Sequence, residues 1–276
     1  MLSALMTIIA VLMISVTPSI TAINIIIPQQ QQAFAIQGDT TTPTTNAACG
    51  QVVEGLVELN SDLNCSGDGL IVAADSSTIR LNGHTIRGLG PDSSKIGISV
   101  GSKEGVRIEG KGTIEQFQIG IFASGAKGTS ITSMTLRENQ IGIFSTGIEN
   151  LQGMQNIITR NNIGFASHSS NGLQLDENLV SGNQLAGITL NATDDSLLSK
   201  NNVRESENGI FVDSESNGNR IESNDLLRNT VDLNNANGLA TNVNSNIFSD
   251  NNCETSNPSG LCTTSSNYLQ PRQRPG

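Results

Sequence analysis

A short phrase centred on glycine returns at a nearly fixed interval, and this period constrains the fold more than any other feature of the chain. Successive centres are 22, 22, 23, 22 and 23 residues apart. They fall at Gly120, Gly142, Gly164, Gly187, Gly209 and Asp232, with earlier copies at Gly97 and Gly69. A fixed period of this length predicts a solenoid, in which each repeat packs only on its neighbours.

The composition favours strands over helices as the repeating element. Charged residues make up 14% of the chain, glycine occurs 28 times and Trp is absent. Helical repeats need more Glu, Lys and Arg, whereas short strands joined by tight turns suit this composition. The net charge of −10 argues against nucleic acid or an anionic membrane as the main partner, because both repel an acidic surface.

Apolar residues alternate after each centre, which predicts short strands. The residue that follows the centre is large and apolar, at Ile98, Ile121, Ile143, Phe165, Ile188, Ile210 and Leu233. Two further apolar columns run through Leu136, Ile158, Val180, Val203, Leu226 and Phe248, and through Ile131, Leu175, Leu198, Ile221 and Val243. Several short strands per repeat predict parallel pairing between neighbouring coils, about 4.8 Å apart.

A column of asparagines keeps the same step along the chain. Its members are Asn156, Asn178, Asn201, Asn224 and Asn246. Side-chain amides that stack at the strand spacing hydrogen-bond to one another along the stack. We therefore expect this column at a bend of the coil.

The recurring Gly-Ile phrase and the segment Leu81-Asn82-Gly83-His84-Thr85-Ile86 resemble the right-handed parallel β-helix superfamily. Pectate lyases, polygalacturonases and mannuronan epimerases share this architecture. The nearest likeness is to its Asn-rich short-repeat branch, which includes NosD-type proteins and many carbohydrate-binding or sugar-hydrolysing domains. The resemblance covers roughly residues 50–250 and implies an all-β, single right-handed parallel β-helix of about eight or nine coils. It is specific for the fold and says little about activity.

The N-terminal region differs from the repeats. Leu2–Val16 is an apolar run, and Ala33-Phe34-Ala35 is a small-x-small triplet of the kind that signal peptidase cleaves. We expect residues 1–35 to be a signal peptide, although no Lys or Arg precedes the apolar run, which leaves an uncleaved anchor as the alternative. Either reading predicts a secreted or cell-surface, extracytoplasmic protein that contacts a membrane only through this segment.

The remaining boundaries follow the repeats. We expect a Thr-rich linker at 36–48, the β-helix at 49–265 and a disordered tail at 266–276. The stretch Gly88–Ser94 lengthens one repeat to 28 residues, so it should protrude as a loop.

The four cysteines flank the repeats in two local pairs, Cys49 with Cys65 and Cys253 with Cys262. In an exported chain they predict two disulfides that staple the ends of the solenoid, and the alternative is four free buried thiols. Asn64 and Asn191 begin glycosylation acceptor triplets, and the neighbouring disulfide would compromise Asn64.

Two columns should face outward, two and four residues after each centre. The first contains Phe122, Phe144, Ala166, Thr189 and Phe211, and the second Ser124, Thr146, His168, Asn191 and Asp213. An aromatic stripe beside a polar stripe is what a carbohydrate-binding face needs. Our candidate ligand contacts are therefore Phe122, Phe144, Thr146, His168, Thr189, Asn191, Phe211 and Asp213. The alternative is that the phenylalanines lie under a loop or a partner.

The resemblance also says which catalytic motifs to look for. The Asn-Thr-Asp, Gly-His-Gly and Arg-Ile-Lys signatures of polygalacturonases are absent, as is the Asp-Pro-His-Asp signature of the epimerases. His84 is expected to be structural, so the remaining catalytic candidates are His168, Asp194, Asp195 and Asp213. A calcium site would use Asp194, Asp195, Asp213 and Glu215, which are otherwise solvated turn residues.

A copper role would need clusters of Met, His or Cys. Met134 and Met154 fall on adjacent coils without such partners, so we interpret them as filling gaps in the core. We predict no resident cofactor, with calcium as the alternative.

These observations support three hypotheses. The first is an exported protein that binds a surface or extracellular polysaccharide without catalysis of its own. The second is a divergent polysaccharide lyase, hydrolase or epimerase that acts around His168 and Asp213. The third is a structural component of the cell envelope, for which the rigidity of a solenoid would suffice.

Overall fold

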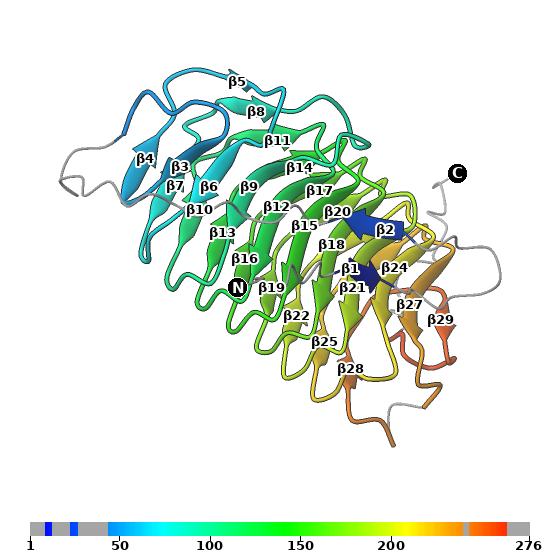
Figure 1. Ribbon diagram of the computed structural model, residues 1–276. Helices are drawn as coiled ribbons and strands as arrows, with labels where there is room; N and C mark the ends of the chain where they lie inside the picture. The colour runs from blue at the N-terminus through cyan, green and yellow to red at the C-terminus, as the bar shows by residue number, and fades with distance from the viewer. Residues whose placement is uncertain (1–8, 13–22, 27–43, 240–242, 264–276) are drawn as a thin grey trace, which may run out of the picture.

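The computed structural model describes residues 9–12, 23–26, 44–239 and 243–263, and within them the chain forms a parallel β-solenoid. Three parallel sheets run the length of the solenoid and form its three sides (Figure 1). The predicted fold class is therefore confirmed. No helix in the described part of the chain is long and apolar enough to cross a membrane.

Each complete coil contributes one strand to each sheet. The anchor sheet, which contains the glycine phrase, consists of β3 (Gln51–Val53), β6 (Leu70–Val72), β9 (Ile96–Val100), β12 (Ile119–Ser124), β15 (Ile141–Thr146), β18 (Ile163–His168), β21 (Ala186–Asn191), β24 (Asn208–Val212), β27 (Val231–Asn235) and β29 (Ser256–Asn257). The first sheet follows it in each coil, with β4 (Leu56–Glu58), β7 (Thr78–Arg80), β10 (Arg107–Glu109), β13 (Ser130–Thr132), β16 (Gln152–Met154), β19 (Gln174–Asp176), β22 (Leu197–Ser199), β25 (Arg220–Glu222) and β28 (Ile247–Ser249).

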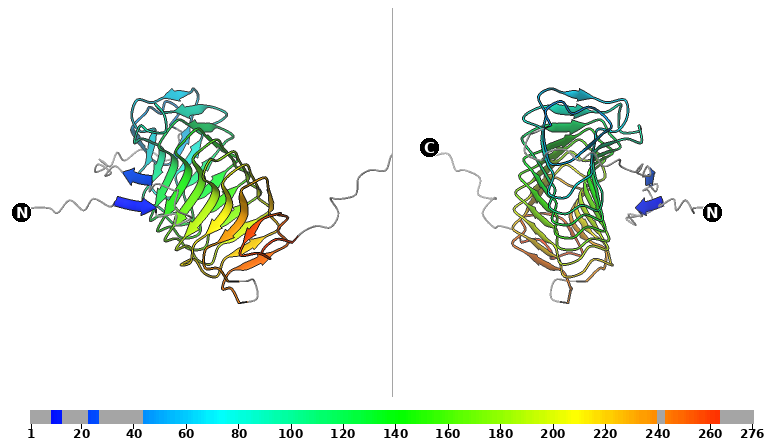
Figure 2. Two further views of the ribbon diagram at one scale, coloured as in Figure 1. Left: turned by 90° about the vertical axis from the view of Figure 1, so that its right-hand side faces the viewer. Right: turned by 60° about the vertical axis from the view of Figure 1, so that its left-hand side comes forward.

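The second sheet completes the coil with β5 (Leu63–Asn64), β8 (Thr85–Arg87), β11 (Thr113–Glu115), β14 (Thr135–Arg137), β17 (Ile157–Thr159), β20 (Leu179–Ser181), β23 (Asn202–Arg204) and β26 (Asp225–Leu227). A separate antiparallel hairpin joins β1 (Ile9–Leu12) to β2 (Ile23–Ile26) and lies beside the solenoid (Figures 1 and 2).

The core is a column of apolar side chains that point inward from all three sheets. In one coil it contains Ile121, Ile131 and Leu136, all fully buried. The inward columns predicted from the alternation are confirmed except at the last coil. There Phe248 pairs with Ile221 in the first sheet, and Val243, which was expected in that column, is 64% exposed. The cause is an insertion that lengthens the last coil and shifts the register.

Asparagine ladders hold the corners of the solenoid together. At the corner between the first and second sheets, Asn178 Oδ1 accepts from both the backbone and the side-chain nitrogen of Asn156 at 3.0 Å. Its own Nδ2 donates to Gly153 O and Asn201 Oδ1 at 2.8 and 2.9 Å. All four hydrogen bonds are buried, so the amide satisfies backbone groups that the turn would otherwise leave unpaired.

The structure corrects one member of the predicted ladder and adds a second ladder. After Asn224 the first ladder continues to Asn251, because the last coil is longer than 22 or 23 residues. Asn246 instead accepts hydrogen bonds from Asn219 at another corner, before the first sheet. The additional ladder, which the sequence reading missed, lies between the second sheet and the anchor sheet and runs through Asn139, Asn161 and Asn183.

The recurring glycines are required by close packing between coils. None of the glycines at 97, 120, 142, 164, 187 and 209 has a positive φ. A Cβ built on any of them would lie only 2.5–2.7 Å from the carbonyl oxygen of the next centre in the column. The column ends at Asp232, whose carboxylate accepts hydrogen bonds from Asn229, Glu254 and Thr255.

Both predicted disulfides are present, Cys49–Cys65 and Cys253–Cys262, and the described residues contain no free cysteine. Thr44 forms a parallel bridge to Val57, so the first sheet begins inside the predicted linker. The hairpin falls within the predicted signal peptide. The rest of residues 1–35 and the predicted tail at 266–276 lie outside the described residues, and those boundaries stay predictions.

We expect Gly142→Ala to lower the free energy of unfolding by about 1–3 kcal/mol, because the added Cβ would overlap Gly164 O at 2.6 Å and the coils cannot separate without loss of sheet hydrogen bonds. Gly67→Ala is the matched control, since a Cβ there meets no atom within 4 Å. Urea denaturation of the two variants checks this, and equal stabilities would contradict the close-packing argument.

Asn161 and Asn162 are neighbours in sequence with opposite expected effects. Asn161→Ala removes four buried hydrogen bonds and should cost about 2–4 kcal/mol of unfolding free energy. Asn162 is only half-buried and its side chain makes no hydrogen bond within the described residues, so Asn162→Ala should stay within about 0.5 kcal/mol of the unmutated chain. Thermal denaturation followed by circular dichroism measures both, and a destabilised Asn162→Ala variant would contradict the assignment.

Candidate functional site

The outward columns predicted on the anchor sheet are formed as expected. Phe122, Phe144, Ala166, Thr189 and Phe211 are successive partners in the sheet register, as are Ser124, Thr146, His168 and Asn191. The rings of Phe122 and Phe144 stack with centroids 5.6 Å apart.

This outward face is not exposed, which corrects the expectation of an open aromatic stripe. Phe122, Phe144 and Phe211 are 5%, 0% and 1% exposed. They belong to a second apolar cluster, separate from the core, together with Ile96, Ile119, Ile141, Ile163, Ala166 and Ala186. The alternative weighed from the sequence, that the phenylalanines lie under other chain, describes the structure better. Whether this face binds a ligand stays a prediction.

The candidate catalytic and calcium residues lie at or near the corner between the anchor sheet and the first sheet. Here the carboxylates are engaged by turns. Asp213 accepts from the backbone nitrogens of Ala192, Glu215 and Ser216 at 2.9–3.2 Å and from Ser216 Oγ at 2.6 Å.

The two neighbouring aspartates are engaged in the same way. Asp194 Oδ1 accepts from Asn217 N at 2.7 Å, and Asp195 Oδ2 accepts from Asn171 Nδ2 at 3.2 Å. Within the described residues, no three His, Cys, Asp or Glu side chains are grouped as a metal ion would need. Calcium binding and catalysis at this corner both stay predictions.

We expect Asp213→Ala to lower the free energy of unfolding by roughly 2–4 kcal/mol, because it leaves several backbone N–H groups of one turn without an acceptor. The loss should be the same in calcium and in EDTA. Thermal denaturation in both buffers checks this, with Glu215→Ala as the control because Glu215 is exposed. A calcium-dependent stability of the unmutated chain that Glu215→Ala removes would favour the calcium site instead.

The two predicted glycosylation sites differ in accessibility. Asn64 is exposed but adjoins the Cys49–Cys65 disulfide. Asn191 is 5% exposed and Thr193 is fully buried, with its hydroxyl bonded to Ser167. The folded chain therefore presents Asn64 and hides the triplet at Asn191.

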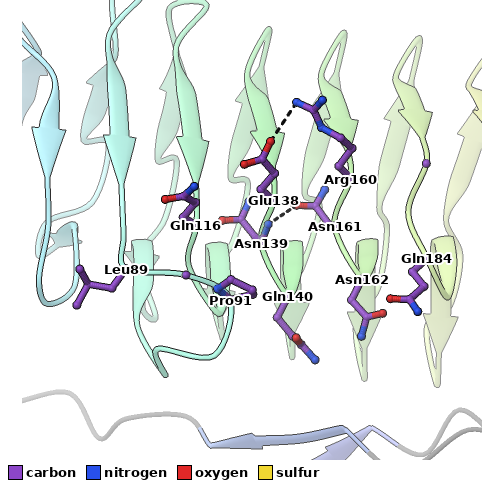
Figure 3. A pocket seen from close by; sticks show the side chains of 12 residues that line it. Leu89, Pro91, Gln116, Glu138, Asn139, Gln140, Arg160, Asn161, Asn162 and Gln184 are labelled. Carbon is purple, nitrogen blue, oxygen red and sulfur yellow. Dashed lines mark hydrogen bonds and ion pairs between the residues drawn. The ribbon is translucent and has the colours of Figure 1, made fainter.

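An open groove that the sequence reading did not identify lies at the corner between the second sheet and the anchor sheet (Figure 3). Its volume is about 670 Å³. Leu89, Gly90 and Pro91 border one end, which confirms that the stretch 88–94 protrudes as a loop. Gln116, Glu138, Asn139, Gln140, Arg160, Asn161, Asn162, Gly182 and Gln184 complete the lining.

The groove is lined by polar but electrically balanced groups. Glu138 and Arg160 form an ion pair at 3.1 Å, which leaves no unpaired carboxylate among the lining residues. Gln140, Asn162 and Gln184 stand on successive coils, and within the described residues no protein group hydrogen-bonds to their side-chain amides. These amides offer donors and acceptors at the spacing of the coils. Leu89, which is 70% exposed, adds apolar surface.

The backbone at this corner explains why these side chains project. Gln116, Glu138 and Arg160 all have left-handed φ values between 55° and 59°. Each of Glu138 and Arg160 is followed by a ladder asparagine, which fixes the turn from inside. A charged or polar residue before each Asn, repeated every 22 residues, is the signal in the sequence that points to the groove.

The one resolved pKa shift lies elsewhere. Hydrogen bonds with Glu109 and then Glu58 raise the pKa of Arg80 above its ordinary value. This ion-pair network lies on the outward side of the first sheet, away from the groove, and has a structural role.

A family model described as periplasmic copper-binding protein (NosD) matches residues 60–268, which is well over half of the chain. The chain belongs to the NosD family. No curated protein matches it in sequence.

Solved structures share the fold at low sequence identity. A mutant of the periplasmic alginate epimerase AlgG aligns with a TM-score of 0.57 and 15% identity, covering 67% of this chain and 53% of that one. The DFA-IIIase of Arthrobacter chlorophenolicus A6 aligns with a TM-score of 0.51 and 17% identity, covering 71% and 53%. The chain thus spans about half the length of these structures, and the likeness shows the parallel β-helix fold alone.

The described residues do not fit the copper site that the family's description implies. Copper proteins use His, Cys and Met donors in clusters. All four cysteines are in disulfides, and Met134 is fully buried in the core. His84 adjoins β8 near the start of the solenoid, whereas His168 ends β18, several coils away. No described cluster therefore provides the donors of a copper site.

Proposed function

We propose that this NosD-family member is an extracytoplasmic protein that binds a neutral polysaccharide in the groove under Leu89–Pro91, without cleaving it. The observation that carries the proposal is the row of unpaired amides on consecutive coils. Sugar hydroxyls need donors and acceptors together, and each side-chain amide offers both. The apolar surface of Leu89 suits the C–H face of a sugar ring.

The charge of the groove favours a neutral ligand. Glu138 and Arg160 neutralise one another, and the chain as a whole carries a net charge of −10. A polyanion such as a uronic-acid polymer would be repelled by this field. Three coil steps span about 14 Å, which is room for a short oligosaccharide segment.

The absence of cleavage is argued from the lining residues. General acid–base cleavage of a glycosidic bond uses two carboxyl groups about 5–10 Å apart. The described lining contains Glu138 as its one carboxylate, and Arg160 holds it. The epimerase and hydrolase names of the solved neighbours describe those proteins, so a divergent enzyme remains the outcome that the test below must separate.

The compartment is inferred from two observations. Disulfides persist in oxidising environments outside the cytoplasm, and this chain has two of them at the ends of the solenoid. The family is described as periplasmic. Both support a location beyond the cytoplasmic membrane.

The test is binding of neutral and uronic-acid polysaccharides by isothermal titration calorimetry. We expect a neutral glycan to bind, and the double variant Gln140→Ala with Gln184→Ala to bind it about tenfold more weakly, because two neutral hydrogen bonds contribute about 1.4 kcal/mol. The matched control is Gln152→Ala with Gln174→Ala, which removes two exposed amides from adjacent coils of the first sheet.

Two results would contradict the proposal. Equal losses in both double variants would remove the groove from the interaction, and an absence of any glycan binding would favour the structural role in the envelope. Release of reducing ends or unsaturated products from the same polysaccharides would favour the enzyme alternative.

A further inference from the structure

The outward side of the anchor sheet is apolar, unlike the outward sides of the other two sheets. We call the nine residues of the second cluster the apolar face: Ile96, Ile119, Phe122, Ile141, Phe144, Ile163, Ala166, Ala186 and Phe211. The corresponding outward positions of the first and second sheets carry residues such as Arg80, Glu109, Thr132, Arg87 and Arg137. Although it points away from the core, the apolar face is at most 5% exposed.

The hairpin of β1 and β2 is the segment that lies over this face. It stands in front of the anchor sheet in Figure 1 and beside the solenoid on the same side in Figure 2. Its strands read Ile-Ala-Val-Leu and Ile-Asn-Ile-Ile and pair through four residues each. No Asp, Glu, Lys or Arg precedes Asp39, so the segment carries no side-chain charge that would oppose burial.

We propose that the hairpin is an intramolecular cover that the exported protein retains and docks on the apolar face. The two elements need each other. A two-stranded hairpin is marginally stable alone in water. Burial of each Ile or Phe side chain contributes about 1.5–3 kcal/mol, so the face gains far more from a cover than from exposure. A bare apolar surface of this extent marks an interaction site in soluble proteins.

The connection between hairpin and solenoid is long enough for this docking. From Ile26 to Thr44 the chain spans about 60 Å when extended. The ten strands of the anchor sheet span about 43 Å at the spacing of paired strands. The tether therefore reaches every coil of the face from its attachment at the first one.

The fit of the cover is incomplete at one edge. His168 Nδ1, Thr189 Oγ1 and Asn191 Nδ2 are buried without a hydrogen-bond partner. Each such atom costs about 1–3 kcal/mol relative to a partnered one. They cluster where the outward columns pass from β18 to β21, so the cover hides a polar patch there that it does not satisfy. Release of the hairpin would return these three groups to solvent or to a ligand.

The decisive measurement is the intact mass of the full chain after export in a bacterial host, with an N-terminal sequence. We expect residues 9–26 to be present in the folded, exported protein. A mature chain that begins at Ile36 would overturn the proposal, and the apolar face would then need another occupant, such as a second copy of the chain.

A second experiment tests docking directly. We expect Phe144→Asp to increase the rate at which proteinase K cuts within the first 43 residues by at least tenfold, because the hairpin would leave the charged face. The control is Thr135→Asp, which places the same charge on the outward side of the second sheet in a neighbouring coil. Retained strand content by circular dichroism shows that each variant is folded, and the milder Phe144→Ala replaces Phe144→Asp if that content is lost.

Equal cutting rates in the unmutated chain and the face variants would overturn the docking. Neither experiment uses the groove, so failure here is distinct from failure of polysaccharide binding.

Discussion

The packing of one coil on the next at the spacing of a β-ladder is the constraint on which the whole molecule depends. Two devices enforce it. The glycine column lets backbones meet where a single Cβ would overlap a carbonyl oxygen. The asparagine ladders satisfy the backbone groups that the turns leave unpaired, and their amides bond to one another from coil to coil. Because every coil repeats both devices, side chains at equivalent positions form columns along the molecule.

The same corners that hold the coils together also position the groove. Residues such as Glu138 and Arg160 adopt left-handed φ values, which costs an L-residue about 1–2 kcal/mol. The buried asparagine that follows each of them offsets that cost through four hydrogen bonds. The turn residue then projects from the edge of the solenoid rather than into it. A device for stacking coils therefore also produces a row of polar side chains, and the loop at 88–94 closes one end of that row.

Much of the fold was readable from the sequence because a solenoid turns sequence spacing into spatial neighbourhood. The glycine centres, the inward columns and four of the five predicted ladder asparagines occupy their expected places. Asn246, Phe248 and Val243 did not, because the longer last coil breaks the equality between one period and one coil. Nothing near these residues in the sequence marks the insertion, and only the pairing of strands reveals the new register.

The candidate site was less predictable for a related reason. Alternation along a strand determines whether a side chain points inward or outward, and Phe144 points outward as the sequence indicates. Alternation does not say what covers it, since the covering hairpin comes from the other end of the chain. Likewise, Gln140 and Gln184 become neighbours of Leu89 only when the coils stack.

The sequence by itself determined the period, the direction of each column and the pairing of the cysteines, all of which follow from local spacing. The tertiary structure alone decided which outward face is buried and where the groove opens. Both depend on contacts between segments separated by one or more whole coils, to which no local pattern is sensitive.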